Sequence, residues 1–408
     1  MAPTRQLKSQ KSIQGAVLLL IVSVLVLGSA ALFLGTQNLN RADLNRRDTV
    51  TRDLQKAKQS LIAFATNYAD DHIDGGAGYG HFPCPDTDND GIPDFPACPF
   101  LEAGRLVTHW TTSAGKAQEL YPYAQESSRQ FWYVTSPEFS THSTSIVNPD
   151  TIAELTVDGI GDVVAVIVDP GPPLSGQTRP SDDVEDYLEG DNADGDENFV
   201  TSVDGEFNDR LIFITREEVM PLVEIRVLYY VLHQLEAIFA DRGYLPYASL
   251  LGDIDDADSV LACVPQINSG FLPVDIDQAL PGCDIGAATN FGAWVKSNRW
   301  HHHIYYHVDD NCDHEATCVP TSNTLEVTID DELRERQSFM VAFFGEVIDA
   351  LGQDRSNPVL PHLPQDYLDS PLSGDTSAGN EVRYEFFPID AVNNDRALSC
   401  QLTGAPCS

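Results

Sequence analysis

Residues 16–35 read AVLLLIVSVLVLGSAALFLG, a run of twenty residues without a charged side chain. A helix of this length covers the hydrocarbon core of a bilayer, which is roughly 30 Å thick. Arg5, Lys8 and Lys11 precede the run, with no acidic residue among them. Because basic flanks stay in the cytoplasm, the sequence predicts one transmembrane helix that exports the rest of the chain. A cleaved secretory signal is the rival interpretation, but its apolar region would be only about 7–15 residues long.

The segment that follows, residues 36–70, is amphipathic. It contains neither Gly nor Pro, and its apolar residues recur at spacings of three and four: Val50, Leu54, Ala57, Leu61, Phe64 and Tyr68. This period is typical of a helix that buries one stripe. The two segments together predict one continuous helix from about Gly15 to Asp70, which at about 1.5 Å per residue would be roughly 80 Å long.

The N-terminus resembles a known family. The stretch QKSIQGAVLLLIVSVLVLG joins a short basic leader, residues 1–15, to an apolar helix directly after Gly15. In this it resembles type IV pilins and the pseudopilins of type II secretion, over about the first 70 residues. The resemblance implies cleavage by a prepilin peptidase after Gly15, methylation of the new N-terminal Ala16, and assembly of the helix with other pilin or pseudopilin subunits in a filament.

One position departs from the family. Major pilins carry Glu at the fifth mature position, where it neutralises the N-terminal amine of a neighbouring subunit, whereas this chain has Leu20. An uncompensated ammonium in an apolar filament core is costly. The chain is therefore expected at a filament tip, and it resembles the large, calcium-binding minor pseudopilin that caps type II secretion pseudopili. An ordinary single-pass anchor that never enters a filament is the alternative.

Charge is divided unevenly along the chain. Residues 1–58 carry nine Lys and Arg against three Asp and Glu; subtracting these from 24 and 62 leaves 15 basic and 59 acidic residues beyond them. So acidic a body repels phosphate backbones and favours cations, which argues against direct nucleic-acid binding.

All eight cysteines lie beyond the apolar segment and fall into four pairs that are close in sequence. These pairs predict four local disulfides: Cys84–Cys98, Cys263–Cys283, Cys312–Cys318 and Cys400–Cys407. Other connectivities are compatible with the sequence, since eight cysteines allow 105. The pattern favours an oxidising compartment, and because no CxxC occurs it does not favour zinc ligation.

The sharpest chemical signal is the segment CPDTDNDGIPDFPAC, residues 84–98. It places carboxylates at loop positions 1, 3, 5 and 9, a Gly at position 6 and a backbone carbonyl at position 7, which predicts calcium ligation by Asp86, Asp88, Asp90, Ile92 and Asp94. Position 12 is Ala97 and not Glu, so the loop resembles those of thrombospondin type 3 repeats more than an EF-hand. A Cys84–Cys98 bridge would preorganise the ligands, and closing this loop would stabilise the fold by about 3 kcal/mol in the chain-entropy model.

Two further clusters give weaker signals. Asp191, Asp194 and Asp196 could hold a second cation, although a solvated mobile loop over 182–197 is the plainer interpretation. The histidines at 301–303, 307 and 314 invite a transition-metal reading. On a strand, however, His301, His303 and His307 would share one face and His302 the other, and no supporting ligands are identifiable.

Beyond residue 70 the sequence predicts a large exported α+β region, residues 71–408, with a subdivision near 245. Buried strands are expected at 131–134, 163–168, 211–215, 303–308 and 324–329. Thr215 and Glu218 form a capping box that opens a helix ending near Gly243, and a second helix is expected from Asp331 to Leu351. The resemblance implies that the long helix packs on an antiparallel sheet within this loop-rich, disulfide-containing fold.

The function expected from these features is binding and assembly. The chain lacks the GxSxG, HExxH, Walker A and GxGxxG patterns, so no enzyme is predicted; an anchored hydrolase with an unrecognised site is the outside alternative. The expected location is the bacterial inner membrane, with the N-terminus cytoplasmic and the body periplasmic or at an extracellular filament tip. The body is expected to contact a secreted substrate or a surface ligand.

Overall fold

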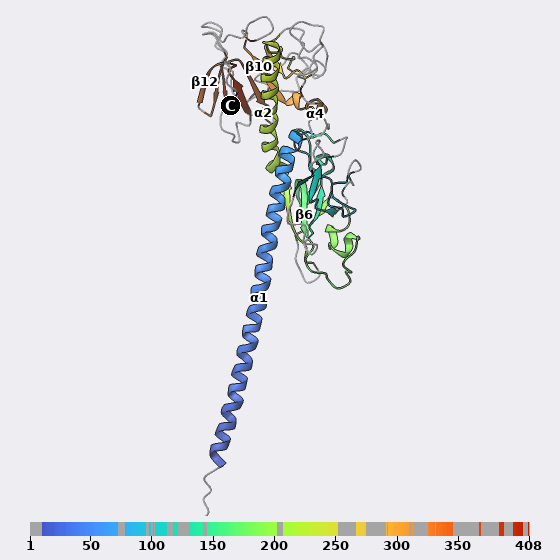
Figure 1. The fold of residues 1–408 in the computed structure, drawn as a ribbon, viewed down its shortest axis with the longest axis vertical. Helices are drawn as coiled ribbons and strands as arrows, with labels where there is room; N and C mark the ends of the chain where they lie inside the picture. Colours follow the sequence, from blue (N-terminus) through green and yellow to red (C-terminus); the bar gives the residue numbers. More distant parts are fainter. Residues whose placement is uncertain are drawn as a thin grey trace, which may run out of the picture. The chain divides into compact units, whose positions relative to one another are not determined.

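The computed structural model divides the chain into two units, residues 1–56 and 57–408. It describes residues 10–71, 78–94, 98, 101, 103–111, 117–120, 130–141, 145–201, 207–251, 267–274, 291, 293–309, 312, 325–330, 332–345, 367–368, 383–386, 395–402 and 407. Figure 1 shows the arrangement of helices and strands.

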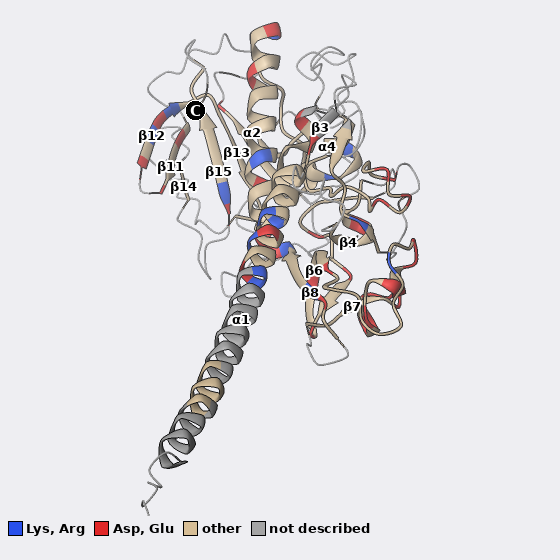
Figure 2. Cartoon of the chain, turned by 60° about the horizontal axis from the view of Figure 1, so that its bottom comes forward, with Lys and Arg blue, Asp and Glu red and all other residues tan. Residues whose placement is uncertain are grey.

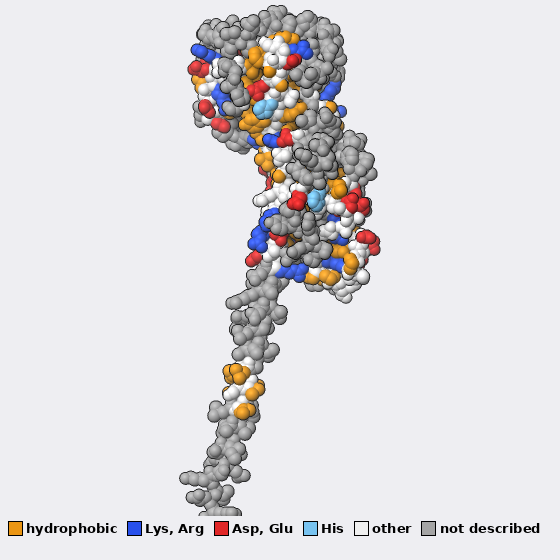
Figure 3. Space-filling view, in the orientation of Figure 1, with side chains coloured by type: hydrophobic (Ala, Val, Ile, Leu, Met, Phe, Trp, Pro, Cys, Tyr) orange, Lys and Arg blue, Asp and Glu red, His pale blue; other side chains and the backbone are white. Residues whose placement is uncertain are grey.

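Helix α1, Gln10–Asp71, contains both helical segments that the sequence predicts. Side chains of its first unit are described at position 20, at 22–27 and from 46 onward. Those of Leu20, Val22 and 24–27 are exposed and apolar, and they form the apolar band on this helix in Figure 3. Among the described residues, no helix combines the length and the apolar character that crossing a bilayer requires.

The last turns of α1 belong to the second unit and bury three positions of the predicted stripe, Ala57, Leu61 and Phe64, while Tyr68 is half-buried. The buried positions are Ala57, Leu61, Phe64, Ala65 and Ala69. The ring of Phe64 meets Trp110 edge-on at 5.0 Å. The Lys58 ammonium donates to the carbonyl of Phe213 at 2.8 Å and to the Glu218 carboxylate at 2.6 Å. Both apolar burial and a basic side chain therefore fix this part of α1 within the second unit.

The larger sheet is built around one long buried strand. Strand β6, Ile160–Asp169, holds the apolar run 163–168, and all of these six residues are buried. The strand order is β1-β4-β6-β5-β7, with β8 also paired to β6. The other strands are β1 Gly104–Arg105, β4 Trp132–Thr135, β5 Leu155–Val157, β7 Asn198–Phe199 and β8 Arg210–Thr215. All pairs are antiparallel except β5 with β7.

Helix α2, Arg216–Arg242, follows β8 directly and confirms the predicted start and end. The Thr215 hydroxyl accepts from the Glu218 N–H, and the Glu218 carboxylate accepts from the Thr215 N–H, which completes the capping box. Gly243 ends the helix in the left-handed conformation, which glycine adopts at low cost. The helix contacts β6 and β8 of the larger sheet and also β13 Phe339–Phe343 and β15 Arg396–Cys400.

Two smaller sheets share an apolar core of their own. One has the order β15-β13-β10-β9 and the other the order β12-β11-β14, in which β11 and β14 are parallel. Their further strands are β9 Ser269–Phe271, β10 Ile304–Val308, β11 Leu325–Ile329, β12 Glu332–Gln337 and β14 Arg383–Phe386. Tyr305, Val327, Met340 and Tyr384 meet in the core between them. The short strands β2 His109–Thr111 and β3 Ala117–Glu119 form a separate hairpin. The described part of the chain is therefore α+β, with a strand at or beside each of the five predicted positions.

The predicted helix over 331–351 is wrong where the structure describes it. Residues 332–337 and 339–343 are strands, and Asp330 turns the chain between β11 and β12 with a φ of 51°. Residues of β13 pair with β10 on one side and β15 on the other, and all five are buried. A short apolar run that is buried on all sides does not show the period of either helix or strand, so tertiary pairing decides.

Disulfides close two loops of the second unit. Cys84 bonds Cys98 and Cys400 bonds Cys407, which are two of the four predicted pairs. Cys312 is also disulfide-bonded. Cys318, Cys263 and Cys283 lie outside the described residues.

Truncating Phe64 tests the burial of α1 in the second unit. Phe64→Ala removes a ring that is 3% exposed and should lower the free energy of unfolding by about 3–5 kcal/mol. Chemical denaturation of the detergent-solubilised chain measures this. Gln59→Ala, at an exposed position of the same helix, should change it by less than about 0.5 kcal/mol. Equal effects of the two variants would contradict burial of this stripe.

Candidate functional site

The aspartate loop lies between α1 and β1 and is fixed at both ends. Cys84 and Cys98 are joined by the disulfide, with their Cα atoms 5.2 Å apart. Asp86 pairs with Arg105 through two backbone hydrogen bonds, in which the Asp86 N–H donates at 3.0 Å and the Arg105 N–H at 2.6 Å. The first predicted ligand is therefore held against the edge of the larger sheet.

Three carboxylates converge in this loop. One oxygen each of Asp86, Asp88 and Asp90 lie within 4.8 Å of one another. Asp86 is fully buried, whereas Asp88 and Asp90 are exposed. Carboxylates at this spacing repel one another unless a cation lies between them, and oxygens from alternate loop residues are the ligands that Ca²⁺ prefers.

Backbone N–H groups position these carboxylates. The Asp86 carboxylate accepts from the Gly91 N–H at 2.8 Å and the Asp90 N–H at 3.2 Å. The Asp90 N–H is shared with Asp88 Oδ1 at 3.2 Å, and Asp90 Oδ1 accepts from the Ile92 N–H at 2.8 Å. The loop therefore winds around the Asp86 side chain, as the alternating aspartates predict.

Gly91 is the point at which the loop meets the strand that follows. Its φ is 88°, and an added Cβ would lie 2.7 Å from the Thr108 hydroxyl. Its carbonyl accepts from the N–H of Thr108 at 3.0 Å and of His109 at 3.1 Å. Sequence reasoning identified the glycine but missed its two partners, which lie 17 and 18 residues further along without a local signal.

Burial and backbone N–H groups act in opposite directions on the pKa of Asp86. Burial raises the pKa of its carboxyl to about 6, although the N–H groups of Gly91, Asn89 and Asp90 oppose the rise. Burial lowers the pKa of the neighbouring Arg105 guanidinium, and Tyr187 and the Asp86 carboxylate oppose that change. A cation in the loop would favour the ionised form of Asp86.

One of the four predicted carboxylate ligands does not converge with the others. Asp94 Oδ2 accepts from both the N–H, at 2.9 Å, and the hydroxyl of Thr87, so its side chain closes the loop by bonding to Thr87. The backbone carbonyl of Ile92, the fifth predicted ligand, stays a prediction. Of the predicted carboxylate ligands, the structure gathers those at positions 86, 88 and 90.

An aromatic pair encloses the side chain of Arg105. The guanidinium carbon lies 3.8 Å from the ring centre of Trp132 and 4.2 Å from that of Tyr187. A desolvated cation over aromatic faces is stabilised by about 2 kcal/mol. The backbone of Arg105 holds Asp86 and its side chain reaches Tyr187, so one residue connects the aspartate loop to the segment that follows β6.

The weaker acidic cluster does not converge among the described residues. Asp194 Oδ1 accepts from the Asp196 N–H at 3.2 Å, and Asp196 Oδ1 accepts from the Asn198 N–H at 2.7 Å. These are local turn contacts, and with Asp191 they do not form a three-carboxylate group. Figure 2 shows acidic positions, in red, spread over the loops near β7.

Sequence reasoning missed a buried carboxylate pair close to this cluster. Glu189 is 9% exposed and Asp209 is 1% exposed. Asp209 immediately precedes β8, whose residues other than Ile214 are only partly buried, so its burial had no local signal in the sequence.

The histidines occupy two different elements. Residues 300–303 form a 3₁₀ helix, so the expected strand alternation of His301, His302 and His303 is wrong. His307 lies on β10, where its Nδ1 is 2.8 Å from the Tyr384 hydroxyl. His314 lies outside the described residues. In the part of the chain that the structure describes, no histidine belongs to a convergent metal-ligand group.

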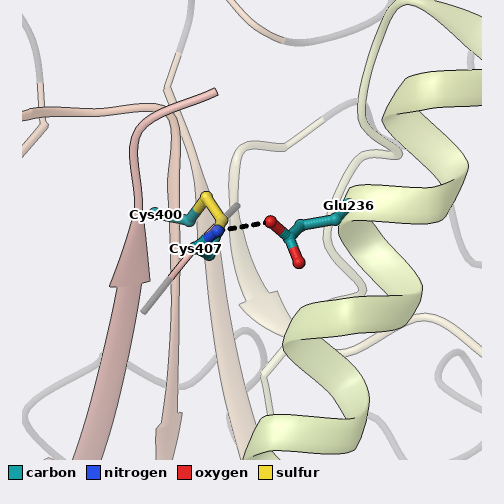
Figure 4. A group of neighbouring side chains, drawn as sticks. All are labelled: Glu236, Cys400 and Cys407. Carbon is teal, nitrogen blue, oxygen red and sulfur yellow. Dashed lines mark hydrogen bonds between the residues drawn. A yellow bond between two sulfur atoms is a disulfide. The ribbon is translucent and has the colours of Figure 1, made fainter. Parts of the chain in front are cut away.

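A second convergent group joins Glu236 to the C-terminal disulfide (Figure 4). The Cys407 N–H donates to Glu236 Oε1 at 2.6 Å. The sulfurs of Cys400 and Cys407 are bonded to each other and are not thiolate ligands, so this group fastens the last described residue to α2.

Comparison with family models, with curated proteins and with solved structures found no match to this chain. The site is therefore interpreted from its own residues.

Gly91 supplies a test of the loop geometry. Gly91→Ala should lower the free energy of unfolding by about 1–2 kcal/mol. An alanine at this positive φ is strained, and its Cβ would clash with the Thr108 hydroxyl. Gly161→Ala, where an added Cβ meets nothing within 4 Å, should be close to neutral. Denaturation curves of the two variants make the comparison, and a neutral Gly91→Ala would contradict the described loop.

Proposed function

We propose that the chain is a minor pilin-like or pseudopilin-like subunit, anchored in the bacterial inner membrane and placed at the tip of a type IV pilus or a type II secretion pseudopilus. Its work is binding and assembly, without catalysis. Helix α1 carries the proposal, because it includes an exposed apolar stretch in the first unit and a buried stripe in the second.

The exposed stretch has the properties of a membrane or filament helix. Leu20 is 66% exposed, Leu25 67% and Leu27 70%. Adjacent positions on a helix point in different directions, so side chains exposed over 22–27 present apolar surface all round. Together with the charge-free run over 16–35, this supports a bilayer or the apolar helices of neighbouring subunits as its surroundings.

The leader and position 20 support the specific assignment. A basic leader ending at Gly15 suits a prepilin peptidase, which would leave Ala16 as the N-terminus. Leu20 cannot neutralise the amine of another subunit, which favours a location with no subunit ahead of it. The same leucine also favours the second candidate, a single-pass periplasmic binding or structural protein that stays outside filaments.

Calcium would stabilise the exported body in this proposal. Asp86, Asp88 and Asp90 supply the oxygens, and the Cys84–Cys98 disulfide and the Arg105 backbone hold the loop in place. A Ca²⁺ ion there would offset the carboxylate repulsion and fix the segment between α1 and the larger sheet. A rigid body suits a tip that contacts a secreted substrate or a surface ligand.

Processing separates the two candidates. On coexpression with a prepilin peptidase, the purified chain should lose residues 1–15 and begin at Ala16, as read by N-terminal sequencing or intact mass. Gly15→Trp should abolish cleavage, because a bulky side chain replaces the small residue before the scissile bond, whereas Gln14→Ala should be cleaved. An intact leader on the natural chain would favour the anchored protein outside filaments.

Calcium binding is the second test. Isothermal titration of the full chain in detergent should show uptake with a dissociation constant at or below about 1 mM, as for extracellular modules. Asp86→Asn or Asp90→Asn should weaken it by about tenfold or more, since each removes a ligand charge. Asp182→Asn, at an exposed site outside the loop, should not change it. Absence of uptake at millimolar calcium would exclude the site.

A further inference from the structure

Glu189 and Asp209 bind one another reciprocally. The Glu189 N–H donates to Asp209 Oδ2 at 3.0 Å, and the Asp209 N–H donates to Glu189 Oε2 at 3.1 Å. Glu189 lies between the 3₁₀ helices at 184–186 and 190–192, and Asp209 immediately precedes β8. Two carboxylates therefore fasten the acidic segment after β6 to the start of the next strand.

The two side chains differ in how their oxygens are satisfied. Glu189 accepts three N–H groups, with Gln177 at 2.8 Å and Asn208 at 2.9 Å besides Asp209. Asp209 Oδ2 accepts a second hydrogen bond from Asn192 Nδ2 at 3.2 Å. Asp209 Oδ1 is fully buried and has no hydrogen-bond partner. An ionised oxygen in that position would be costly, because no protein donor compensates its charge.

The charged groups around the pair do not supply the missing partner. Arg179 faces Glu189, Asp209 and Asp169, and Tyr187 lies beside it. The hydrogen bonds of the Arg179 guanidinium go to other acceptors: the carbonyls of Pro170, Gly171, Asp186 and Tyr187 and the Gln177 side chain. The negative charge of the Glu189 carboxylate acts against ionisation of Asp209 and raises its pKa.

We propose that Asp209 carries a proton on Oδ1 in the folded protein, and that the Glu189–Asp209 pair is a pH-operated latch on the segment 170–201. The carboxylate of Glu189 has three N–H donors, which Asp209 Oδ1 lacks. The proton neutralises Asp209 and gives Oδ1 a donor that faces the neighbouring carboxylate. One proton is thus shared within a pair that could not ionise twice without repulsion.

The direction of the pH dependence follows from burial. Burial chiefly raises the pKa of Asp209, to about 8 in the fold from an ordinary value near 3.8. The closed latch therefore binds a proton that the open segment releases, so latch stability is greatest in acid. It falls as the pH rises from about 4 to about 8, and levels off above that.

Opening the latch would change the surface of the protein. The segment it holds carries Asp182, Asp183, Glu185, Asp191 and Asp194. Repulsion between these carboxylates favours the open form, and so does the loss of the Asp209 proton. The Arg179 hydrogen bonds to this segment would be released at the same time.

Hydrogen exchange of the full-length protein tests the latch. Protection of amides 188–192, corrected for the pH dependence of intrinsic exchange, should fall by about tenfold per pH unit between pH 5 and 7. Asp209→Asn places an amide N–H where the proton lies and should abolish the fall while keeping protection. Asp182→Asn, an exposed carboxylate of the same segment, should keep the natural pH dependence.

Three outcomes would overturn the proposal. The first is natural protein with equal protection at pH 5 and 7, and the second is Asp209→Asn with an unchanged fall. The third is restoration of protection at pH 7 by calcium in an Asp86→Asn variant, whose aspartate loop has lost a ligand, since this would show that a cation occupies the position assigned to the proton. Infrared spectra of the natural protein add a test that needs no variant to fold, because a protonated carboxyl band that Asp209 contributes should persist at pH 7 and disappear above pH 9.

Discussion

Helix α2 has to bury apolar side chains on more than one side, and the architecture of the second unit depends on this constraint. Its buried residues include Val219, Val223, Val227, Val231 and Leu235, which recur every four positions, and Leu228 and Leu232, which each follow one of them directly and so point to a different side. A sheet packs against only one side of a helix, so no single sheet could cover both faces. The helix therefore lies against β6 and β8 of one sheet and against β13 and β15 of another. An ion pair between Arg396 of β15 and Glu224 of α2, at 3.0 Å, also joins the helix to the second sheet, and its geometry is directional where apolar contact is not.

Negative charge is the second constraint, and the carboxylates of two sites are compensated in different ways. In the aspartate loop, backbone N–H groups converge on Asp86 and leave oxygens of Asp86, Asp88 and Asp90 directed to a common centre. In the Glu189–Asp209 pair, one carboxylate receives three donors and the other is left with an unpartnered oxygen. The first arrangement suits a cation and the second a proton, because a cation needs several free oxygens and a proton needs only one.

These sites are physically connected through Arg105. Its backbone pairs with Asp86, and its guanidinium lies between Trp132 and Tyr187. The Tyr187 carbonyl in turn accepts from Arg179, which holds the acidic segment together. A contiguous set of contacts thus runs from the aspartate loop to the latch. Its existence allows coupling between them, and double-mutant cycles would measure how strong that coupling is.

The sequence by itself determined the elements whose signals are local. The period of apolar residues gave the extent of α1, the Thr215 capping box and Gly243 bounded α2, and close cysteine spacing gave two disulfides. The spacing of three aspartates gave a convergent group. Each of these depends on residues only a few positions apart, so neighbouring side chains contain the information.

Only the tertiary structure decided the features that join distant residues. Phe339–Phe343 became a strand because β10 and β15 lie on either side of it, although the same run suits a helix. Asp94 turned to Thr87 and left the carboxylate group, and Thr108 and His109 took the Gly91 carbonyl. Glu189 and Asp209 became a buried pair across 20 residues. Burial and hydrogen bonding of this kind depend on which surfaces come together, and a local pattern of residues does not specify that.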